Sequence, residues 1–454
     1  MKTDTIAAIA TAMAGSGIGI VRISGEEAVS ITDQIFHMPG GKKLSDMETH
    51  TIHYGHIRDG EEVIDEVMVL LMRGPRSYTR EDTVEIDCHG GVYVMKRILE
   101  TVIKYGARPA EPGEFTKRAF LNGRIDLSQA ESVIDVISAK NEFALKSSMK
   151  QLSGAVSDAV KEIRGEILHE IAFIESALDD PEHISLDGYG ERLELTIEGA
   201  VDRIEKLLAS SDNGRILKEG ISTVIVGKPN AGKSSLLNTL LGEERAIVTE
   251  IAGTTRDVLE EQINLNGIVL NIIDTAGIRD TDDIVEKIGV DKARKYVKDA
   301  DLILYVVDAS TNLDENDREI MELLHVLLNK SDLTPLTTAE DIRAHVDKDC
   351  PVISISAREQ KGIDVFTEQI REMFFRGEVT FNDEVYITNI RHKTALQEAL
   401  SSLHLVEQSI ADGMPEDFYS IDLMNAYEVL GTIIGEAVED DLVNEIFSKF
   451  CLGK

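Results

Sequence analysis

The chain has 454 residues, enough for about three domains, and carries a net charge of −35 with 43% hydrophobic residues. This charge argues against a generic nucleic-acid binder, whose affinity comes mostly from neutralising phosphates. Because no apolar run can span a bilayer and the three cysteines lie far apart, we expect a cytoplasmic protein without a disulfide framework or zinc site.

Residues 1–120 are expected to form an α+β domain. Short β-branched runs at 19–23, 67–72 and 84–88 predict strands, and residues 92–105 show a helical pattern. This part holds 14 basic and 18 acidic residues, so most of the negative charge lies elsewhere. An acidic ligand, such as folate or RNA, is therefore easier to place against this part of the chain.

Residues 121–215 and 377–454 are expected to be helical. Spacings of three and four predict one face of a long amphipathic helix, formed by Val160, Ile163, Ile167, Ile171, Ile174 and Leu178. Helical periodicity returns from residue 386 to 450. Two helical blocks on either side of an inserted domain are expected to pack together as one bundle.

Residues 216–376 begin with a phosphate-binding motif. The apolar run 221–226 is followed by Gly-Lys-Pro-Asn-Ala-Gly-Lys-Ser-Ser at 227–235. In such a loop the backbone N–H groups surround a polyphosphate, Lys233 reaches its outer phosphates, and the Ser234 hydroxyl ligates magnesium. The motif predicts a P-loop at the start of a helix.

Three further motifs follow in the order that a guanine-nucleotide domain requires. Asp274-Thr275-Ala276-Gly277 ends a second apolar run and suits the magnesium shell and the γ-phosphate. In 329–332, Asp332 can accept from the ring N–H and the exocyclic amine of guanine, while Asn329 and Lys330 brace the loop. Ser356-Ala357 offers a backbone N–H to the guanine carbonyl, although alone it would be an ordinary turn. The ordered set predicts a GTPase domain.

The catalytic groups are less evident. Ile278 follows Gly277 where many G proteins use Gln to orient water, so another carboxylate and another positive charge are needed. Glu286 lies in the segment that follows, among other acids, and on composition alone a solvated surface role is at least as favoured. Asn230, beside the phosphates, permits a potassium ion without requiring one.

Over essentially its full length the chain resembles a known family, the MnmE/TrmE family of tRNA wobble-uridine modification GTPases. The shared features are Gly-Ile-Val-Arg-Ile-Ser-Gly at 19–25, Glu85 with His89-Gly90-Gly91, the run 112–131, the nucleotide motifs including Ala-Gly-Thr-Thr-Arg-Asp at 252–257, and the terminal Cys-Leu-Gly-Lys. The resemblance implies a homodimer. Each chain would have three parts: an N-terminal α+β domain for tetrahydrofolate binding and dimerisation (1–120), a discontinuous α-helical bundle (121–215 and 377–454) and an inserted α/β P-loop GTPase domain (216–376).

The resemblance also implies an activity. A potassium-stimulated GTP hydrolase would work in a heterotetramer with a flavin-dependent partner of the MnmG/GidA type, which carries the FAD. The pair would add a carboxymethylaminomethyl or aminomethyl group to C5 of the wobble uridine of certain tRNAs. The one-carbon donor would be 5-formyl- or 5,10-methylene-tetrahydrofolate.

Carried onto this sequence, the resemblance assigns site residues. Folate would contact Arg22, Glu85, Arg124 and Lys454; potassium would be held by Asn230, Thr249, Ile251 and Thr254; magnesium by Ser234 and Thr255; Glu286 would orient water, and Cys451 would be a catalytic thiol. The GTP-binding residues would be Asn230, Ala231, Gly232, Lys233, Ser234, Ser235, Thr249, Glu250, Ile251, Ala252, Gly253, Thr254, Thr255, Asp274, Thr275, Ala276, Gly277, Asn329, Lys330, Asp332, Ser356 and Ala357.

Two departures and one rival interpretation remain. Position 124 is Arg where the family also has Lys, and the connection before Asn329 is short, which affects the helix and strand boundaries there. The rival is a regulatory RNA-associated G protein, such as a ribosome-assembly GTPase. Its signature would be a basic appendage after the GTPase domain, and this chain has an acidic helical block instead.

Overall fold

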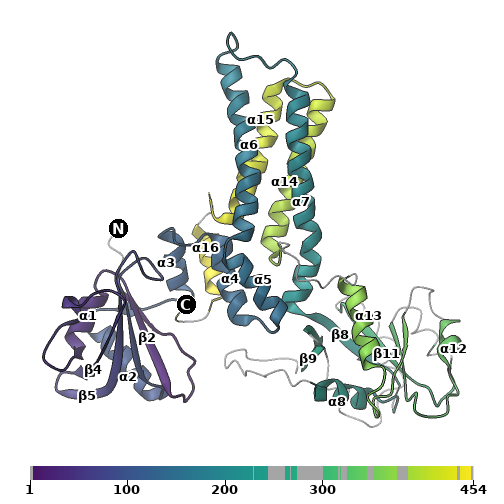
Figure 1. The fold of residues 1–454 in the computed structure, drawn as a ribbon, viewed down its shortest axis with the longest axis horizontal. Helices are drawn as coiled ribbons and strands as arrows, with labels where there is room; N and C mark the ends of the chain where they lie inside the picture. The colour runs from purple at the N-terminus through teal and green to yellow at the C-terminus, as the bar shows by residue number, and fades with distance from the viewer. Residues whose placement is uncertain are drawn as a thin grey trace. The chain divides into compact units, whose positions relative to one another are not determined.

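A computed structural model describes residues 4–228, 230–243, 261–265, 267–273, 300–314, 317, 325–344, 351–375, 387–436, 440–450 and 453 (Figure 1). The chain divides into two compact units. Met1–Ile137, Met149–Val201 and Ala395–Lys454 form the first unit, and Ser138–Ser148 with Asp202–Thr394 form the second. Of the helices described, none is long and apolar enough to cross a membrane.

The first unit begins with a seven-stranded sheet of order β3-β4-β5-β6-β2-β1-β7, antiparallel except for the β1–β7 pair. Its strands are β1 (Ile6–Ile9), β2 (Ile18–Ser24), β3 (Phe36–His37), β4 (Thr51–Asp59), β5 (Glu62–Met72), β6 (Thr83–His89) and β7 (Arg108–Pro109). The predicted strands at 19–23, 67–72 and 84–88 are confirmed, and β5 is longer than the sequence indicated.

One face of this sheet is buried by helices. Helices α1 (Ala28–Ile35) and α2 (Val92–Lys104) place Ile31, Ile35 and Ile98 against the inward side chains of β2, β5 and β6. Side chains alternate along each strand, so Val21 and Ile23 are buried while Arg22 between them lies on the other face. A short 3-10 helix, η1 (Leu44–Asp46), completes this part.

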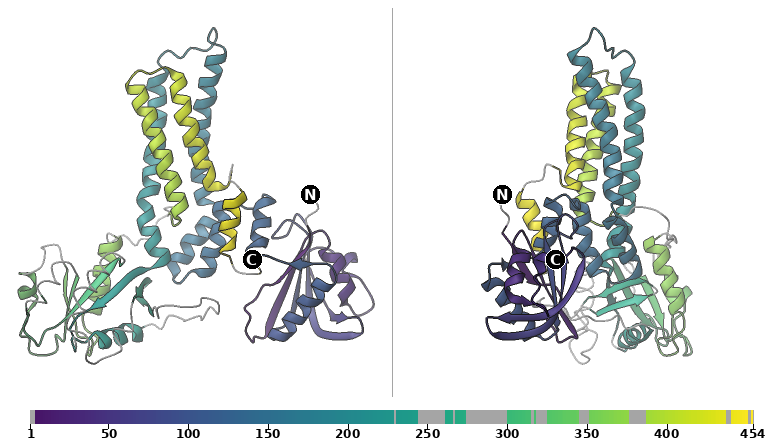
Figure 2. Two further views of the ribbon diagram at one scale, coloured as in Figure 1. Left: turned by 180° about the vertical axis from the view of Figure 1, so that it is seen from behind. Right: turned by 60° about the vertical axis from the view of Figure 1, so that its left-hand side comes forward.

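Helices make up the remainder of the first unit. They are α3 (Glu114–Leu121), α4 (Leu127–Ser138), the end of α5 (Glu142–Leu152), α6 (Ala155–Asp179), the start of α7 (Tyr189–Glu219), most of α14 (Ile390–Ala411), α15 (Glu416–Ile434) and α16 (Asp440–Ser448). Helices α6 and α15 run side by side in all views (Figures 1 and 2). Arg164 of α6 bonds the Tyr427 carbonyl of α15 at 3.0 Å and lies over its ring.

The predicted apolar face of α6 is confirmed except at one residue. Val160, Ile163, Ile167, Ile171 and Ile174 are buried, whereas Leu178 is 46% exposed. Leu178 lies in the last turn of the helix, before Pro181, and Ala177 takes the buried place there. The periodicity therefore predicted the helix but chose the wrong buried residue in its last turn.

The chain's last helix packs against α3, more than three hundred residues earlier in the sequence. Phe447 and Phe450 are buried with Leu127 and Val443, and Lys117 of α3 bonds Asn444 of α16 at 2.6 Å. Gly113 precedes α3 with φ of +68°, and a Cβ there would lie 2.7 Å from the Phe447 carbonyl. This approach needs a glycine, because other residues would be both strained and too large.

The second unit is a six-stranded sheet of order β13-β12-β11-β8-β10-β9, parallel except for β9. Its strands are β8 (Ile221–Val226), β9 (Glu261–Leu265), β10 (Ile268–Ile272), β11 (Leu302–Asp308), β12 (His325–Asn329) and β13 (Val352–Ser354). Its helices include α8 (Lys233–Glu243), α12 (Ala339–Arg343) and α13 (Ile363–Phe375). The predicted strand 221–226 and the helix after the P-loop are confirmed.

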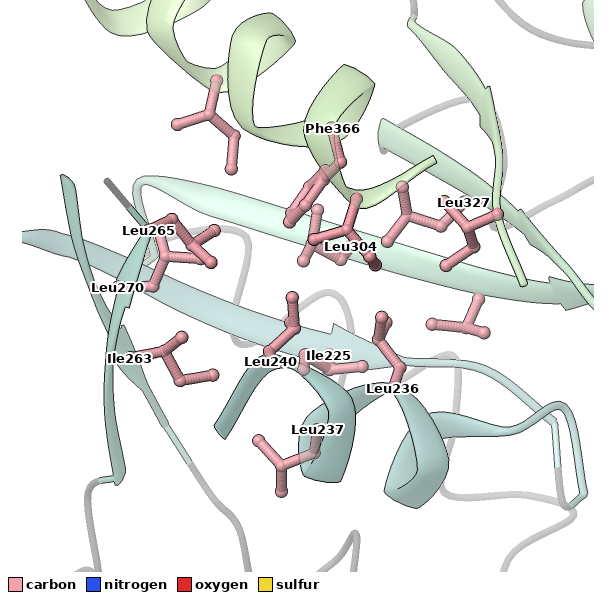
Figure 3. Packing of buried hydrophobic residues seen from close by; sticks show 14 of the residues in the cluster. Ile225, Leu236, Leu237, Leu240, Ile263, Leu265, Leu270, Leu304, Leu327 and Phe366 are labelled. Carbon is pink, nitrogen blue, oxygen red and sulfur yellow. The ribbon is translucent and has the colours of Figure 1, made fainter. Parts of the chain in front are cut away.

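Helices cover both faces of this sheet. Leu302, Leu304 and Val306 of β11 lie in a core with residues of α8 and α13, of which Leu236, Leu240 and Phe366 are drawn in Figure 3. The alternate residues Ile303, Tyr305 and Val307 lie in a second core with Ile342 of α12. A strand buried on both faces is hydrophobic throughout, which explains why β11 reads as a continuous apolar run.

Gly113→Ala is expected to destabilise the first unit by about 1–3 kcal/mol, because the new methyl group must displace backbone and Phe450. Gly41→Ala is the matched control, since Gly41 has φ of +70° but open space around its Cβ position. It should show only the conformational cost, about 1 kcal/mol. Urea unfolding followed by circular dichroism measures both, and equal losses would show that the α3–α16 contact is not tight.

Candidate functional site

The nucleotide motifs meet at one edge of the second unit's sheet. The parallel strands β8, β11, β12 and β13 end at Val226, Asp308, Asn329 and Ser354. In open α/β sheets the carboxyl ends of parallel strands form the ligand-binding crevice. The P-loop follows β8, the base-reading segment follows β12, and Ser356-Ala357 follows β13, so motifs 130 residues apart in sequence share this edge.

The backbone of the P-loop turns tightly. Gly227 and Gly232 have φ of +153° and +95°, and Asn230 between them has φ of +63°. A Cβ on Gly227 would lie 2.4 Å from the Val306 carbonyl of β11, and one on Gly232 would lie 2.2 Å from Asn329 Nδ2. Both glycines are therefore required by close approach to the neighbouring strands.

Lys233 opens α8 and folds back over the loop. Its Nζ donates to the carbonyl oxygens of Gly227 and Lys228, both at 2.8 Å. Burial lowers the pKa of this ammonium. Within the described part of the chain its hydrogen bonds go to neutral carbonyls, so its charge is available to a phosphate.

Asn329 connects two loops of the site. It is buried at the end of β12, its Nδ2 donates to the Ala231 carbonyl at 3.0 Å, and its Oδ1 accepts from the Ala357 N–H at 3.2 Å. Thr239 of α8 also donates to the Ala357 carbonyl at 2.8 Å. The P-loop and the Ser356-Ala357 segment are thus held at a fixed separation.

Ser356 also orients the Asp332 side chain, a role that the sequence did not reveal. Its hydroxyl donates to Asp332 Oδ1 at 2.7 Å and accepts from the Glu359 N–H at 3.2 Å. This hydrogen bond lowers the pKa of the exposed Asp332 carboxyl. Asp332 is therefore held ionised and oriented, the state in which it can accept two N–H groups from a guanine edge.

Two ion pairs at this edge were missed by sequence reasoning. Lys330, with φ of +62°, pairs with Asp308 at the end of β11. Burial raises the pKa of Asp308, but the bonds from Lys330 and Ser310 outweigh it and the net shift is downward. Lys228 of the P-loop lies 2.6 Å from the buried Asp317 carboxylate. For Asp308, its position directly after the apolar run 302–307 was the available signal.

Many predicted site residues lie outside the described residues. These are Thr249, Glu250, Ile251, Ala252, Gly253, Thr254, Thr255, Asp274, Thr275, Ala276, Gly277, Glu286, Cys451 and Lys454. The predicted roles of these residues in metal binding, catalysis and folate binding stay predictions. Asn230, Ala231, Gly232, Lys233, Ser234 and Ser235 lie along the P-loop and the first turn of α8, where the motif predicted them.

In the first unit the structure brings three other predicted residues together. Arg22 of β2 and Glu85 of β6 are opposite each other across the strand pair, and Arg22 Nε lies 2.6 Å from Glu85 Oε1. Arg124, which follows α3, has its guanidinium carbon 4.8 Å from the centre of the Tyr78 ring, and that of Arg22 lies 6.0 Å from the same ring.

The end of the chain reaches this cluster. Arg22 Nη1 donates to the carbonyl oxygen of Gly453 at 3.2 Å, and Gly453 is buried with φ of +87°. A Cβ at this position would lie 2.4 Å from the Ile9 carbonyl of β1. Tyr78 and Phe115, whose ring lies 5.6 Å from the Arg22 guanidinium, were not assigned to the site from the sequence. Tyr78 stands in no motif, and Phe115 lies in the shared run 112–131 without a predicted role.

Two known family profiles match this chain. The family profile described as the GTP-binding protein TrmE N-terminus matches residues 5–124, and that of the MnmE helical domain matches residues 127–451. The G domain of the T. maritima FeoB iron transporter aligns with 34% of this chain and 97% of its own at 24% identity. Its TM-score of 0.25 is too low to bear on the fold.

Relatives match along the whole chain. The tRNA modification GTPase MnmE of Lachnoclostridium phytofermentans is 61% identical over 100% of both chains. The proteins of the same name from Clostridioides difficile and Bacillus subtilis are 50% and 47% identical, each over 99% of this chain and at least 99% of their own. With the nucleotide edge described above, these identities show a GTP-hydrolysing enzyme of tRNA modification, and the chain belongs to the MnmE family of tRNA modification GTPases.

Proposed function

We propose that this enzyme couples potassium-stimulated GTP hydrolysis to the addition of a carboxymethylaminomethyl or aminomethyl group at C5 of the wobble uridine of certain tRNAs. The one-carbon unit comes from a reduced folate bound by the N-terminal domain, residues 1–120. The helical domain, 121–215 with 377–454, carries the inserted GTPase domain, 216–376. The cluster of Arg22, Glu85, Arg124 and the chain's end is the observation that carries the proposal.

The cluster offers the complementary groups that a folate needs. Glu85 can accept from the amino group and ring N–H of a pterin, as Asp332 does for guanine. Arg22 and Arg124 are cations placed around one aromatic ring, suited to the p-aminobenzoyl ring and the glutamate carboxylates. Lys454 follows Gly453, whose carbonyl bonds Arg22, so its position in sequence supports a place at this site.

At the nucleotide edge the chain's own residues bind and orient the GTP. Lys233 contacts the outer phosphates, and Asp332, oriented by Ser356, selects guanine. Magnesium would be held by Ser234 and Thr255, and potassium by Asn230, Thr249, Ile251 and Thr254; the two ions would supply positive charge at the phosphates. Glu286 would orient the attacking water in place of the missing Gln.

Two partners belong to the proposal. A second copy of the chain would pair through the N-terminal domain, where the outer face of the sheet exposes the cross-strand neighbours Tyr54 and Met68 with Ile52. A flavin-dependent protein of the MnmG/GidA type would join this dimer and carry the FAD. Cys451 would then act at the modification centre, close to the folate.

Arg124→Ala is expected to weaken reduced-folate binding by about tenfold to a hundredfold, because a charged hydrogen-bonding partner of the ligand is lost. GTP hydrolysis should be unchanged, because this residue lies in the other compact unit from the P-loop. Calorimetric titration with 5-formyl-tetrahydrofolate measures the loss. Lys96→Ala, which removes an exposed cation of α2 in the same domain, is the control. Equal affinity in Arg124→Ala and the parent would contradict the proposed site.

Asp332→Asn is expected to weaken GTP binding by at least a hundredfold and to admit xanthosine triphosphate. The new side-chain amide donates a hydrogen bond toward the exocyclic amine of guanine, which is itself a donor. Xanthine has a carbonyl oxygen in place of that amine, and this oxygen can accept the bond. Competition between fluorescent GTP and unlabelled nucleotides measures both effects. Asp364→Asn, an exposed carboxylate at the start of α13, is the control. Retention of guanine selectivity in Asp332→Asn would show that the base is read elsewhere.

Asn230→Ala is expected to abolish the preference for potassium over sodium in GTP hydrolysis while leaving nucleotide affinity within a few-fold. The amide oxygen supplies one ligand to the ion, and the phosphates are held by other groups of the loop. Initial rates at equal potassium and sodium concentrations, with affinity from titration, separate the two effects. Equal rates of the parent protein in the two salts would overturn the potassium proposal.

A further inference from the structure

A groove lies beside Tyr78 and Arg124 in the first unit. Its volume is about 600 Å³, within the range of small-molecule sites, and its lining includes His50, Arg76 and Arg80 together with Tyr78 and Arg124. Three of the nine lining residues are arginines and none is acidic. In a chain of net charge −35, a groove with this lining suits an anionic ligand.

The acids nearest in sequence do not neutralise this groove. Glu81 and Asp82 follow Arg80 directly, but neither lines it. Glu81 lies 3.0 Å from the buried Arg118 and accepts from Ser24, and Asp82 accepts from the Gly74 N–H at 2.9 Å. The loop 76–82 therefore contributes Arg76 and Arg80 to the groove, while its two carboxylates contact residues outside the groove lining.

The loop is also held in place before any ligand arrives. Arg80 Nη1 donates to the carbonyl oxygens of Asn122 and Gly123 at 2.9 and 3.1 Å, which ties it to the segment that carries Arg124. The Ser77 hydroxyl bonds the Glu81 carbonyl, and Thr79 bonds Ser24 at 2.7 Å. A preorganised cationic groove loses little side-chain entropy when it binds a ligand.

The groove is continuous with the cluster of the proposed function but extends beyond it. Tyr78 and Arg124 belong to both, whereas Arg22 and Glu85 do not line the groove. A folate with its pterin at Glu85 and its glutamate at Arg124 would leave Arg76 and Arg80 without a partner from the ligand. Further residues of a γ-glutamyl chain would supply one carboxylate each in this direction.

We propose that the groove binds the oligo-γ-glutamyl tail of the folate, so that the enzyme's substrate class is the polyglutamylated rather than the monoglutamyl cofactor. This inference rests on the proposed folate function. Arginine binds carboxylates through two parallel hydrogen bonds, and the exposed residues Arg76 and Arg80 line the same groove as Arg124. A phosphate backbone needs a long row of cations, so the geometry favours a short anionic chain over RNA.

Titrating the full-length protein with the monoglutamyl and tri-γ-glutamyl forms of 5-formyl-tetrahydrofolate tests the proposal. The tri-γ-glutamyl form should bind about three- to tenfold more tightly at low salt, and the advantage should shrink as salt is raised. Arg76→Glu should remove this advantage, because it should weaken the tri-γ-glutamyl form several-fold more than the monoglutamyl form. Lys96→Glu, which makes the same charge change on α2 outside the groove, should retain it.

The results that would contradict the tail site differ from those that would contradict the folate function. If neither form binds, the proposed folate function itself fails. If both forms bind equally, or if Arg76→Glu keeps the advantage, the folate function stands and the groove is not the tail site. Loss of tRNA binding in Arg76→Glu with an unchanged folate advantage would assign the groove to RNA and overturn the proposal.

Discussion

The amide of Asn329 is the interaction on which the geometry of the nucleotide site depends most directly. Both of its polar atoms are buried and both bond backbone groups of other loops, so neither the P-loop nor the Ser356-Ala357 segment can shift alone without leaving a polar atom unpaired. Such an unpaired group costs about 1–3 kcal/mol, which is a large share of the stability of a small domain. The approach of Gly232 to this amide explains why the P-loop has a glycine there.

In the first unit, too, a single side chain bonds several segments of the chain, and that side chain is Arg22. The guanidinium of this residue contacts Glu85 on the neighbouring strand and the Gly453 carbonyl near the chain's end, and it lies near the rings of Tyr78 and Phe115. One side chain thus joins segments from four places in the sequence. The packing of α16 on α3, with Gly113 in close contact, brings the end of the chain near enough for this bond.

Much of the fold could be predicted because its signals are local. The apolar run of β8, the helix after the P-loop and the apolar face of α6 depend on period and on turn residues within about twenty positions. Predictions were less accurate where packing decides the outcome. Leu178 fits the period but is exposed, whereas its neighbour Ala177 is buried in the same last turn of α6.

The sequence by itself determined the motifs, their order and the family to which they belong, because glycine, lysine and carboxylate spacings in a P-loop domain are set by the ligand's chemistry. Only the tertiary structure decided which residues support those motifs. Ser356 holds Asp332, Lys330 pairs with Asp308, and the ring of Tyr78 lies near two arginines. These contacts join residues that are 22 to 56 positions apart, and no periodicity or spacing encodes them. They exist because parallel strands end at a common edge and because the chain folds its end back onto its first strands.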